Sequence, residues 1–308
     1  MFYNLRIWAL GYGPGIALTG EEYADLLGAI ERTYLATGVE EKLDLLLENF
    51  LEYERELLDI ALHHSLFTPL DDHRVFHDAQ LINRRVVNLL TAARMYVDQV
   101  KHAVSAYFKS ASASQPDVAA LLSAEYDDNL EYRIAEALRN YAQHQDLPVH
   151  ELSWPSAWEG MNEPQHRLRF WVTPSIMVDE LATAGDFKAS VLAELRATGK
   201  KSFPLTPILR RYVESLASVH SKLREVLASQ ATLDHQTVDT AMARARSELR
   251  ESSVGLVISA GDDLEKPTEH HYVSERSWTR QKTLIAKNSH LTKLSRRYVS
   301  AEHPGDAV

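Results

Sequence analysis

Apolar residues recur at helical spacing along most of the first half of the chain. Between residues 76 and 108 they step by three or four positions, which places them on one continuous face of a helix. The members of this face are Ile82, Val86, Leu89, Ala93, Val97, Val100 and Val104. The same spacing predicts further helices at about 20–36, at 40–64 and from Asp117 to a stop at Asp146-Leu-Pro148. Thr19 and Glu22 form a capping-box pattern that predicts the start of the first of these helices.

After Pro148 short apolar runs alternate with helical patterns. We expect strands at 167–173, 254–259 and 270–274, with the last two pairing. We expect helices at about 176–197, 205–229, 234–251 and 277–298. Residues 11–15 lack the Gly-Lys-Ser/Thr that completes a phosphate loop, so they are interpreted as a turn before the first helix. The pattern predicts a mainly α fold, with a helical bundle over 1–150 and an α-rich accessory region over 151–308 that carries two or three short strands and a basic C-terminal helix.

Composition excludes several kinds of chemistry. The 308 residues include no cysteine, which excludes disulfides, zinc–thiolate sites, iron–sulfur clusters and a cysteine nucleophile. No apolar run approaches the roughly 18 residues that a membrane-spanning helix needs, and no secretion signal is apparent at the N-terminus. The sequence therefore predicts a cytoplasmic protein with no membrane partner, and no motif in it calls for a metal or another cofactor.

The net charge of −10 is unevenly distributed. Residues 21–59 hold twelve acidic and three basic residues, a local charge of −9, whereas 276–297 hold seven basic residues and no acidic one. The basic residues are Arg276, Arg280, Lys282, Lys287, Lys293, Arg296 and Arg297. Two interpretations are open. Either these are solvated helix faces that neutralise each other, or the basic helix binds the phosphates of RNA while the acidic helices repel RNA elsewhere.

The strongest candidate for chemistry is the group of Arg139, Asn140 and His144, near the end of the helix that Pro148 stops. An arginine can grip two phosphate oxygens, and a histidine can move a proton near neutral pH. Together they can cleave RNA without a metal: the imidazole takes the proton of a ribose 2′-OH, and the guanidinium stabilises the charge that develops on the phosphate. The spacing alone is weak evidence, because Arg297 and His303 form a similar pair.

Helix geometry adds a constraint on this site. Positions 139 and 144 are about 140° apart on an ideal helix, so they do not share a face unless the helix end unwinds. Positions 140 and 144 do share a face. A single copy of the motif is therefore a poor active site, and two copies that meet across a two-fold axis would form a better one.

The chain resembles the HEPN superfamily, whose helical bundles carry an arginine, usually a polar residue, three to five further residues and then a histidine. Arg139, Asn140 and His144 fit this pattern, and residues 83–98 resemble the partner helix of many bacterial members. The resemblance covers about 20–150. It implies a metal-independent endoribonuclease that acts as a homodimer, with Arg139 and His144 catalytic and Asn140 orienting them. It also implies a toxin or antiviral-defence role, with RNA as substrate and an antitoxin or defence-system protein as partner.

Alternative functions remain open at this point. One is a noncatalytic helical scaffold that docks a protein partner, in which His144 is buried or packed against carbonyls. Another is a regulatory HEPN domain in which Arg139 binds a nucleotide. Arg94 and Asp98, one turn apart, form either a surface ion pair of little energetic weight or a support that holds Arg139 or His144 in place.

Two further groups of residues are weaker candidates. His73 and His77, with Asp71 nearby, have the spacing of metal ligands but lack the His-Glu-x-x-His setting, so we expect no metal site there. The aromatic residues Trp154, Trp158, Phe170 and Trp171 can stack bases. We expect them instead to pack a loop over the bundle.

Overall fold

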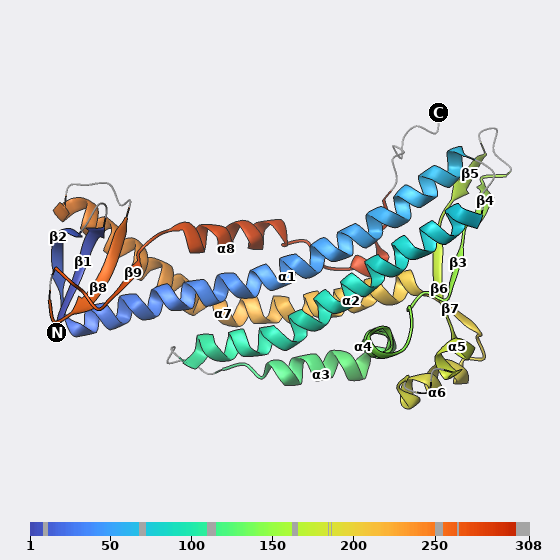
Figure 1. The fold of residues 1–308 in the computed structure, drawn as a ribbon, viewed down its shortest axis with the longest axis horizontal. Coiled ribbons are helices and arrows are strands. Elements are labelled where there is room, and N and C mark those ends of the chain that lie inside the picture. The colour runs from blue at the N-terminus through green and yellow to red at the C-terminus, as the bar shows by residue number, and fades with distance from the viewer. Residues whose placement is uncertain are drawn as a thin grey trace. The chain divides into compact units, whose positions relative to one another are not determined.

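The computed structural model describes residues 1–8, 12–67, 72–109, 115–161, 166–183, 185, 187–249, 255–263 and 265–299. The eight α-helices described are α1 (Gly20–Leu66), α2 (Asp72–Lys109), α3 (Val118–Asp128), α4 (Leu130–His144), α5 (Val178–Thr183), α6 (Ala189–Ala197), α7 (Leu205–Leu249) and α8 (Arg276–Lys287) (Figure 1). The strands are β1 (Phe2–Trp8), β2 (Tyr12–Leu18), β3 (Glu151–Ser153), β4 (Ser156–Glu159), β5 (Arg167–Phe170), β6 (Thr173–Met177), β7 (Ser202–Pro204), β8 (Leu256–Gly261) and β9 (Glu269–Tyr272). The prediction of a mainly α fold is confirmed. In the described part of the chain, none of the helices is both long enough and apolar enough to cross a bilayer.

The chain divides into two compact units. Unit 1 comprises Met1–Lys42, Gln99–Val118 and Ser221–His290, and unit 2 comprises Leu43–Asp98, Ala119–His220 and Leu291–Val308. The helices α1, α2 and α7 contribute residues to both. Each unit draws on residues from both sides of position 150. Because compactness does not test whether 1–150 and 151–308 are separate domains, that division stays a prediction.

Unit 1 contains a four-stranded antiparallel sheet with the strand order β2-β1-β8-β9. The prediction of a simple turn at the N-terminus was wrong, because residues 2–8 and 12–18 pair as the antiparallel strands β1 and β2. Gly13 and Gly15 lie in β2, and Gly11 is outside the described residues. The predicted pairing of the two late strands is confirmed as β8 with β9. Strand β1 is stabilised by β8, about 250 residues away in sequence, and this pairing leaves no local signal in the sequence.

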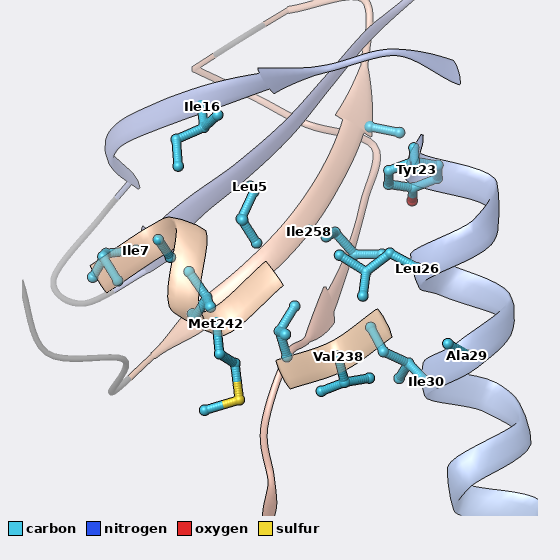
Figure 2. Close-up of a cluster of buried hydrophobic side chains, with 14 residues drawn as sticks. Leu5, Ile7, Ile16, Tyr23, Leu26, Ala29, Ile30, Val238, Met242 and Ile258 are labelled. Carbon is cyan, nitrogen blue, oxygen red and sulfur yellow. The ribbon is translucent and has the colours of Figure 1, made fainter. Parts of the chain in front are cut away.

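The core of unit 1 lies between this sheet and two helices. Figure 2 shows Leu5, Ile7, Ile16 and Ile258 of the sheet facing apolar side chains of the helices. The start of α1 supplies Tyr23, Leu26, Ala29 and Ile30, and the end of α7 supplies Val238, Met242 and Ala245. Each fully buried aliphatic side chain of this kind contributes about 2 kcal/mol to stability.

Two helices are longer than the sequence pattern predicted. The predicted break between 36 and 40 is absent, and α1 is continuous from Gly20 to Leu66. A glycine such as Gly38 costs a helix about 1 kcal/mol relative to alanine but does not end it. The hydroxyls of Thr33 and Thr37 donate to carbonyls one turn earlier, which satisfies both side chains inside the helix. Likewise α7 continues through the predicted break after residue 229, where the hydroxyl of Thr232 donates to the carbonyl of Ala228.

The start of α1 confirms the capping box. The backbone N–H of Thr19 donates to Glu22 Oε2 at 2.7 Å, and the N–H of Glu22 donates to Thr19 Oγ1 at 3.1 Å. These bonds satisfy two of the N–H groups that every helix start leaves without an intrahelical acceptor. They also lower the pKa of Glu22, because the cap stabilises its charged form.

Other helices are shorter or more divided than expected. The single helix predicted from Asp117 is α3 and α4, separated at Asn129, whose backbone is extended. The guanidinium of Arg133 donates to the carbonyls of Tyr126 and Asp127, which compensates for the carbonyls left open at the end of α3. The helix predicted over 176–197 is the end of β6 followed by α5 and α6, and the last helix stops at Lys287 rather than 298.

Unit 2 also contains two small sheets. Strands β3, β6 and β7 form one with the order β3-β6-β7, and β4 and β5 form a separate hairpin. The strand predicted over 167–173 is therefore β5 and the first residue of β6. Of the aromatic residues near it, Trp154 stacks against His64 with ring centroids 5.3 Å apart, which fits the packing interpretation. Trp158 and Trp171 are exposed.

Candidate functional site

Helix α4 carries the Arg139–Asn140–His144 group at its C-terminal end. One face of the helix is buried in unit 2, through Tyr132, Ile134, Ala135, Ala137, Leu138 and Tyr141. This periodicity leaves Arg139 half-buried and turns Asn140 and His144 to the solvent. Pro148 cannot continue a helix, and α4 ends at His144 as predicted.

The end of α4 stays helical, which fixes the geometry of the motif. The backbone N–H of Gln145 donates to the carbonyl of Tyr141 at 2.9 Å, so the last turn does not unwind. Within one chain Arg139 and His144 therefore remain about 140° apart around the helix. Asn140 and His144 lie one turn apart on the same exposed face.

Arg139 and Asn140 contact each other directly. Arg139 Nη1 donates to Asn140 Oδ1 at 2.9 Å, and this bond fixes the position of the guanidinium from one side. The Nε atom of Arg139 is buried and has no hydrogen-bond partner among the described residues. His144 is exposed and makes no hydrogen bond or ion pair with the described part of the chain. The group therefore offers an oriented guanidinium and an accessible imidazole, the two functions that phosphate chemistry needs.

The structure places Arg94 and Asp98 against a different residue of α4. Arg94 binds Asp98 through two nitrogens at 2.8 and 2.9 Å, and its Nη1 lies 3.4 Å from Glu136 Oε2. The hydroxyl of the buried Tyr212 donates to the other oxygen of Glu136. Burial lowers the pKa of Arg94, but the two carboxylates outweigh it and the pKa is raised. In the described structure this pair thus reaches Glu136 and makes no hydrogen bond to Arg139 or His144.

Sequence reasoning missed one residue that holds the end of α4. His150 Nδ1 accepts the backbone N–H of Met177 at 3.0 Å, and its Nε2 lies 3.1 Å from the hydroxyl of Tyr141. Because Nδ1 accepts, the proton of the neutral ring is on Nε2, which donates to Tyr141. Burial lowers the pKa of His150, although the charges of Glu180 and Asp146 oppose this. No spacing in the sequence marks His150, since its partners are a backbone N–H and a tyrosine.

The seven basic residues near the C-terminus do not share one helix. Arg276, Arg280, Lys282 and Lys287 are on α8 in unit 1, whereas Lys293, Arg296 and Arg297 follow it and belong to unit 2. Arg280 lies 3.5 Å from Glu41, and the Lys282 ammonium lies 4.0 Å from the ring centroid of Trp278. The prediction of a single basic helix over 276–297 was therefore wrong.

The acidic stretch of α1 is paired along much of its length with arginines from distant elements. The pairs are Glu22–Arg244, Glu40–Arg224 and Glu41–Arg280 in unit 1, and Glu52–Arg85, Glu56–Arg85 and Glu54–Arg210 in unit 2. The −9 of this stretch is thus opposed locally by arginines. Only the Glu41–Arg280 pair joins it to the basic residues of 276–297, so the interpretation that these two regions neutralise each other stays a prediction.

Next to His77, near the start of α2, lies a carboxylate that already has partners. Asp78 is fully buried, with His64 Nε2 at 2.9 Å from Oδ2 and Arg74 Nε at 2.8 Å from Oδ1. The exposed His77 lies 3.7 Å away. No group of three metal-ligating side chains occurs in the described ranges, and Asp71 falls outside them.

Comparison with protein-family models, with curated proteins and with solved structures finds no match for this chain.

Proposed function

We propose that the chain is a HEPN-like, metal-independent endoribonuclease that acts as a homodimer, as a toxin or phage-defence effector. The observation that carries the proposal is the bond from Arg139 to Asn140, beside an exposed His144 that has no polar partner among the residues that the structure describes. It supports the orienting role assigned to Asn140. The exposure of His144 argues against the scaffold alternative, which requires this residue to be packed away.

The proposed reaction needs only groups that the motif provides. His144 removes the proton from a ribose 2′-OH, and the 2′-oxygen bonds to the adjacent phosphorus. The bond from phosphorus to the 5′-oxygen breaks, and the 5′-oxygen takes a proton from water, so the products are a 2′,3′-cyclic phosphate and a 5′-hydroxyl. The guanidinium of Arg139 stabilises the negative charge on the phosphate oxygens. Because Arg139 and His144 of one chain point about 140° apart, we propose that each site combines Arg139 of one copy with His144 of the other. The basic residues of α8 and of the segment after it would add phosphate contacts.

The test is cleavage of labelled single-stranded RNA in the presence of EDTA. Arg139→Ala and His144→Ala should each reduce the rate by about 100-fold or more. Arg196→Ala and His73→Ala are matched controls, because both residues are exposed and Arg196 also lies in the last turn of a helix. An oligonucleotide with a single 2′-deoxyribose at the cleaved position should stay intact. Intact RNA with the wild-type protein, across single-stranded and structured RNAs, would contradict the proposal.

A mixing experiment tests the composite site itself. A heterodimer of the two inactive variants contains one site with both residues and one site with neither. After subunit exchange the mixture should therefore regain about a quarter of wild-type activity. No recovery, with exchange shown by subunit labelling, would mean that each site uses one copy only.

A further inference from the structure

The part of α1 in unit 2 is apolar on two opposite faces. One face is buried in the core of the unit through Tyr53, Leu57 and Ile60. The other is the leucine stripe, defined as Leu51, Leu58, Leu62 and Leu66, whose exposed fractions are 38%, 48%, 60% and 67%. On an ideal helix the stripe spans about 80°, centred about 180° from the buried face. A surface helix normally has one apolar face and a polar opposite face, so this second face needs a cover.

Two charged residues lie beside the leucine stripe. Arg55 and Asp59 lie between the leucines on the same side of the helix, one turn apart, and both are exposed. Neither has an ion pair or hydrogen bond with the described residues of the chain. Their acidic neighbours Glu52 and Glu56 both bind Arg85, which reaches across from α2. Glu52 and Glu56 are thus paired within unit 2, whereas Arg55 and Asp59 have no partner among the described residues.

The stripe borders a hollow in the surface. A depression of about 640 Å³ is lined by Arg55, Leu58, Asp59 and Leu62 of α1 and by Arg85 of α2, among others. It is open to solvent and has space for side chains of a helix laid along α1. Exposed apolar residues that gather at one place, rimmed by charges, are typical of protein interfaces.

We propose that the leucine stripe is an interface with a second copy of this chain, packed antiparallel along α1. The charge pattern favours a second copy as the partner, because a cation and an anion one turn apart are self-complementary about a two-fold axis. An axis level with residue 57 places Arg55 of each copy beside Asp59 of the other. With a rise of about 1.5 Å per residue, Leu51 then lies next to Leu62 of the second copy, and the two Leu58 side chains lie within about 3 Å of the same level.

This interface is independent of the proposed nuclease site. The stripe contains no residue of the α4 motif, and α4 is bonded to α2 through Arg94 and to α7 through Tyr212. Loss of the α1 contact should therefore show in the mass of the assembly, and loss of the nuclease site should show in the cleavage rate. The His144→Ala variant should keep the wild-type mass.

Molar mass from light scattering after gel filtration, over a range of protein concentrations, tests the interface. The wild-type protein should reach at least twice the 34.8 kDa of one chain. The Leu58→Glu/Leu62→Glu variant should halve that mass while its circular dichroism spectrum stays unchanged, because both residues are exposed. Leu45→Glu is the matched control: Leu45 is 45% exposed on α1 but lies about 140° from Leu58 around the helix, so the mass should not change.

Charge reversal tests the two-fold arrangement. Arg55→Asp and Asp59→Arg should each weaken association by about tenfold, because each places like charges together twice per dimer. The double variant Arg55→Asp/Asp59→Arg restores opposite charges and should return to nearly wild-type affinity. A monomeric wild-type protein, an unchanged mass for Leu58→Glu/Leu62→Glu, or a double variant as weak as the single ones would each overturn the proposal. A monomer that binds the helix of a different protein at this stripe would overturn it as well.

Discussion

Unit 1 and unit 2 each contain a carboxylate that accepts hydrogen bonds from an arginine and a tyrosine. In unit 1 the carboxylate is Asp234 of α7, which Arg32 of α1 binds through both oxygens at 2.7 to 3.0 Å. Gln230 donates to it at 3.0 Å and Tyr107 of α2 at 3.4 Å. The side chains of Arg32 and Asp234 are 12% and 2% exposed, so this ion pair is almost completely removed from water.

The cluster in unit 2 uses the same residue types but remains open to solvent. Its carboxylate is Glu136 of α4, bound by the buried Tyr212 and by Arg94, which also pairs with Asp98. The side chains of Glu136, Arg94 and Asp98 are 18%, 38% and 47% exposed. Further along the same helix, His144 is exposed and has no hydrogen bond or ion pair with the described part of the chain. Residue type alone therefore does not predict whether such a cluster is closed to water, as at Asp234, or open to it, as at Glu136.

The largest expected effect on the free energy of unfolding comes from replacing Asp234. Asp234→Asn leaves the Arg32 charge buried without a counter-ion, which should destabilise the protein by about 3–5 kcal/mol. The measurement is the free energy of unfolding from urea denaturation. The double variant Arg32→Leu/Asp234→Leu removes both charges and should be more stable than Asp234→Asn. A change below 1 kcal/mol for Asp234→Asn would mean that water reaches Arg32 and that the cluster is not closed.

A smaller effect is expected at Glu136. Glu136→Gln keeps an acceptor for Tyr212 but removes the charge that faces Arg94, so a loss of about 1–3 kcal/mol is expected by the same measurement. Asp98→Asn is the matched control, because it removes the more exposed partner of Arg94 and should cost less than about 1 kcal/mol. Equal losses for Asp234→Asn and Glu136→Gln would remove the distinction between the closed and the open cluster.

The sequence predicted the elements whose signals are local. The apolar face from Ile82 to Val104 predicted α2, and the capping box predicted the start of α1. Strand β1 was missed because it depends on pairing with β8. The breaks expected in α1 and α7 do not occur, and the hydroxyls of Thr37 and Thr232 near these positions bond to carbonyls of their own helices. Local patterns do not encode which distant segment supplies a partner.

The candidate site shows the same limit. The order of Arg139, Asn140 and His144 on one helix could be predicted, as could the angle between them. The partner of Arg94 could not, since Glu136 lies 42 residues away on another helix. His150 was missed for the same reason. Whether two copies of the motif meet across a two-fold axis stays a prediction.

The smallest expected effect on stability is at His150. Measuring it tests whether groups besides Glu136 and the apolar face hold α4 in unit 2. His150 anchors the end of α4 through Tyr141 and binds the N–H of Met177. Its lowered pKa means that the unfolded chain binds its proton more readily than the folded chain does, so stability rises with pH across this titration. The contribution of His150 is complete above the ordinary histidine pKa of about 6.5 and is lost as pH falls towards the lower value of the folded protein.

Comparing His150→Gln with the wild-type protein isolates this contribution from the other histidines. The variant should be less stable by about 1 kcal/mol near pH 7.5, the value of a typical hydrogen bond. That difference should shrink as the pH falls to about 5, because protonation of wild-type His150 removes the acceptor of the Met177 N–H. Urea denaturation at a series of pH values measures it. A difference that stays constant with pH would show that His150 does not titrate in this range, and that Glu136 and the apolar face alone hold α4.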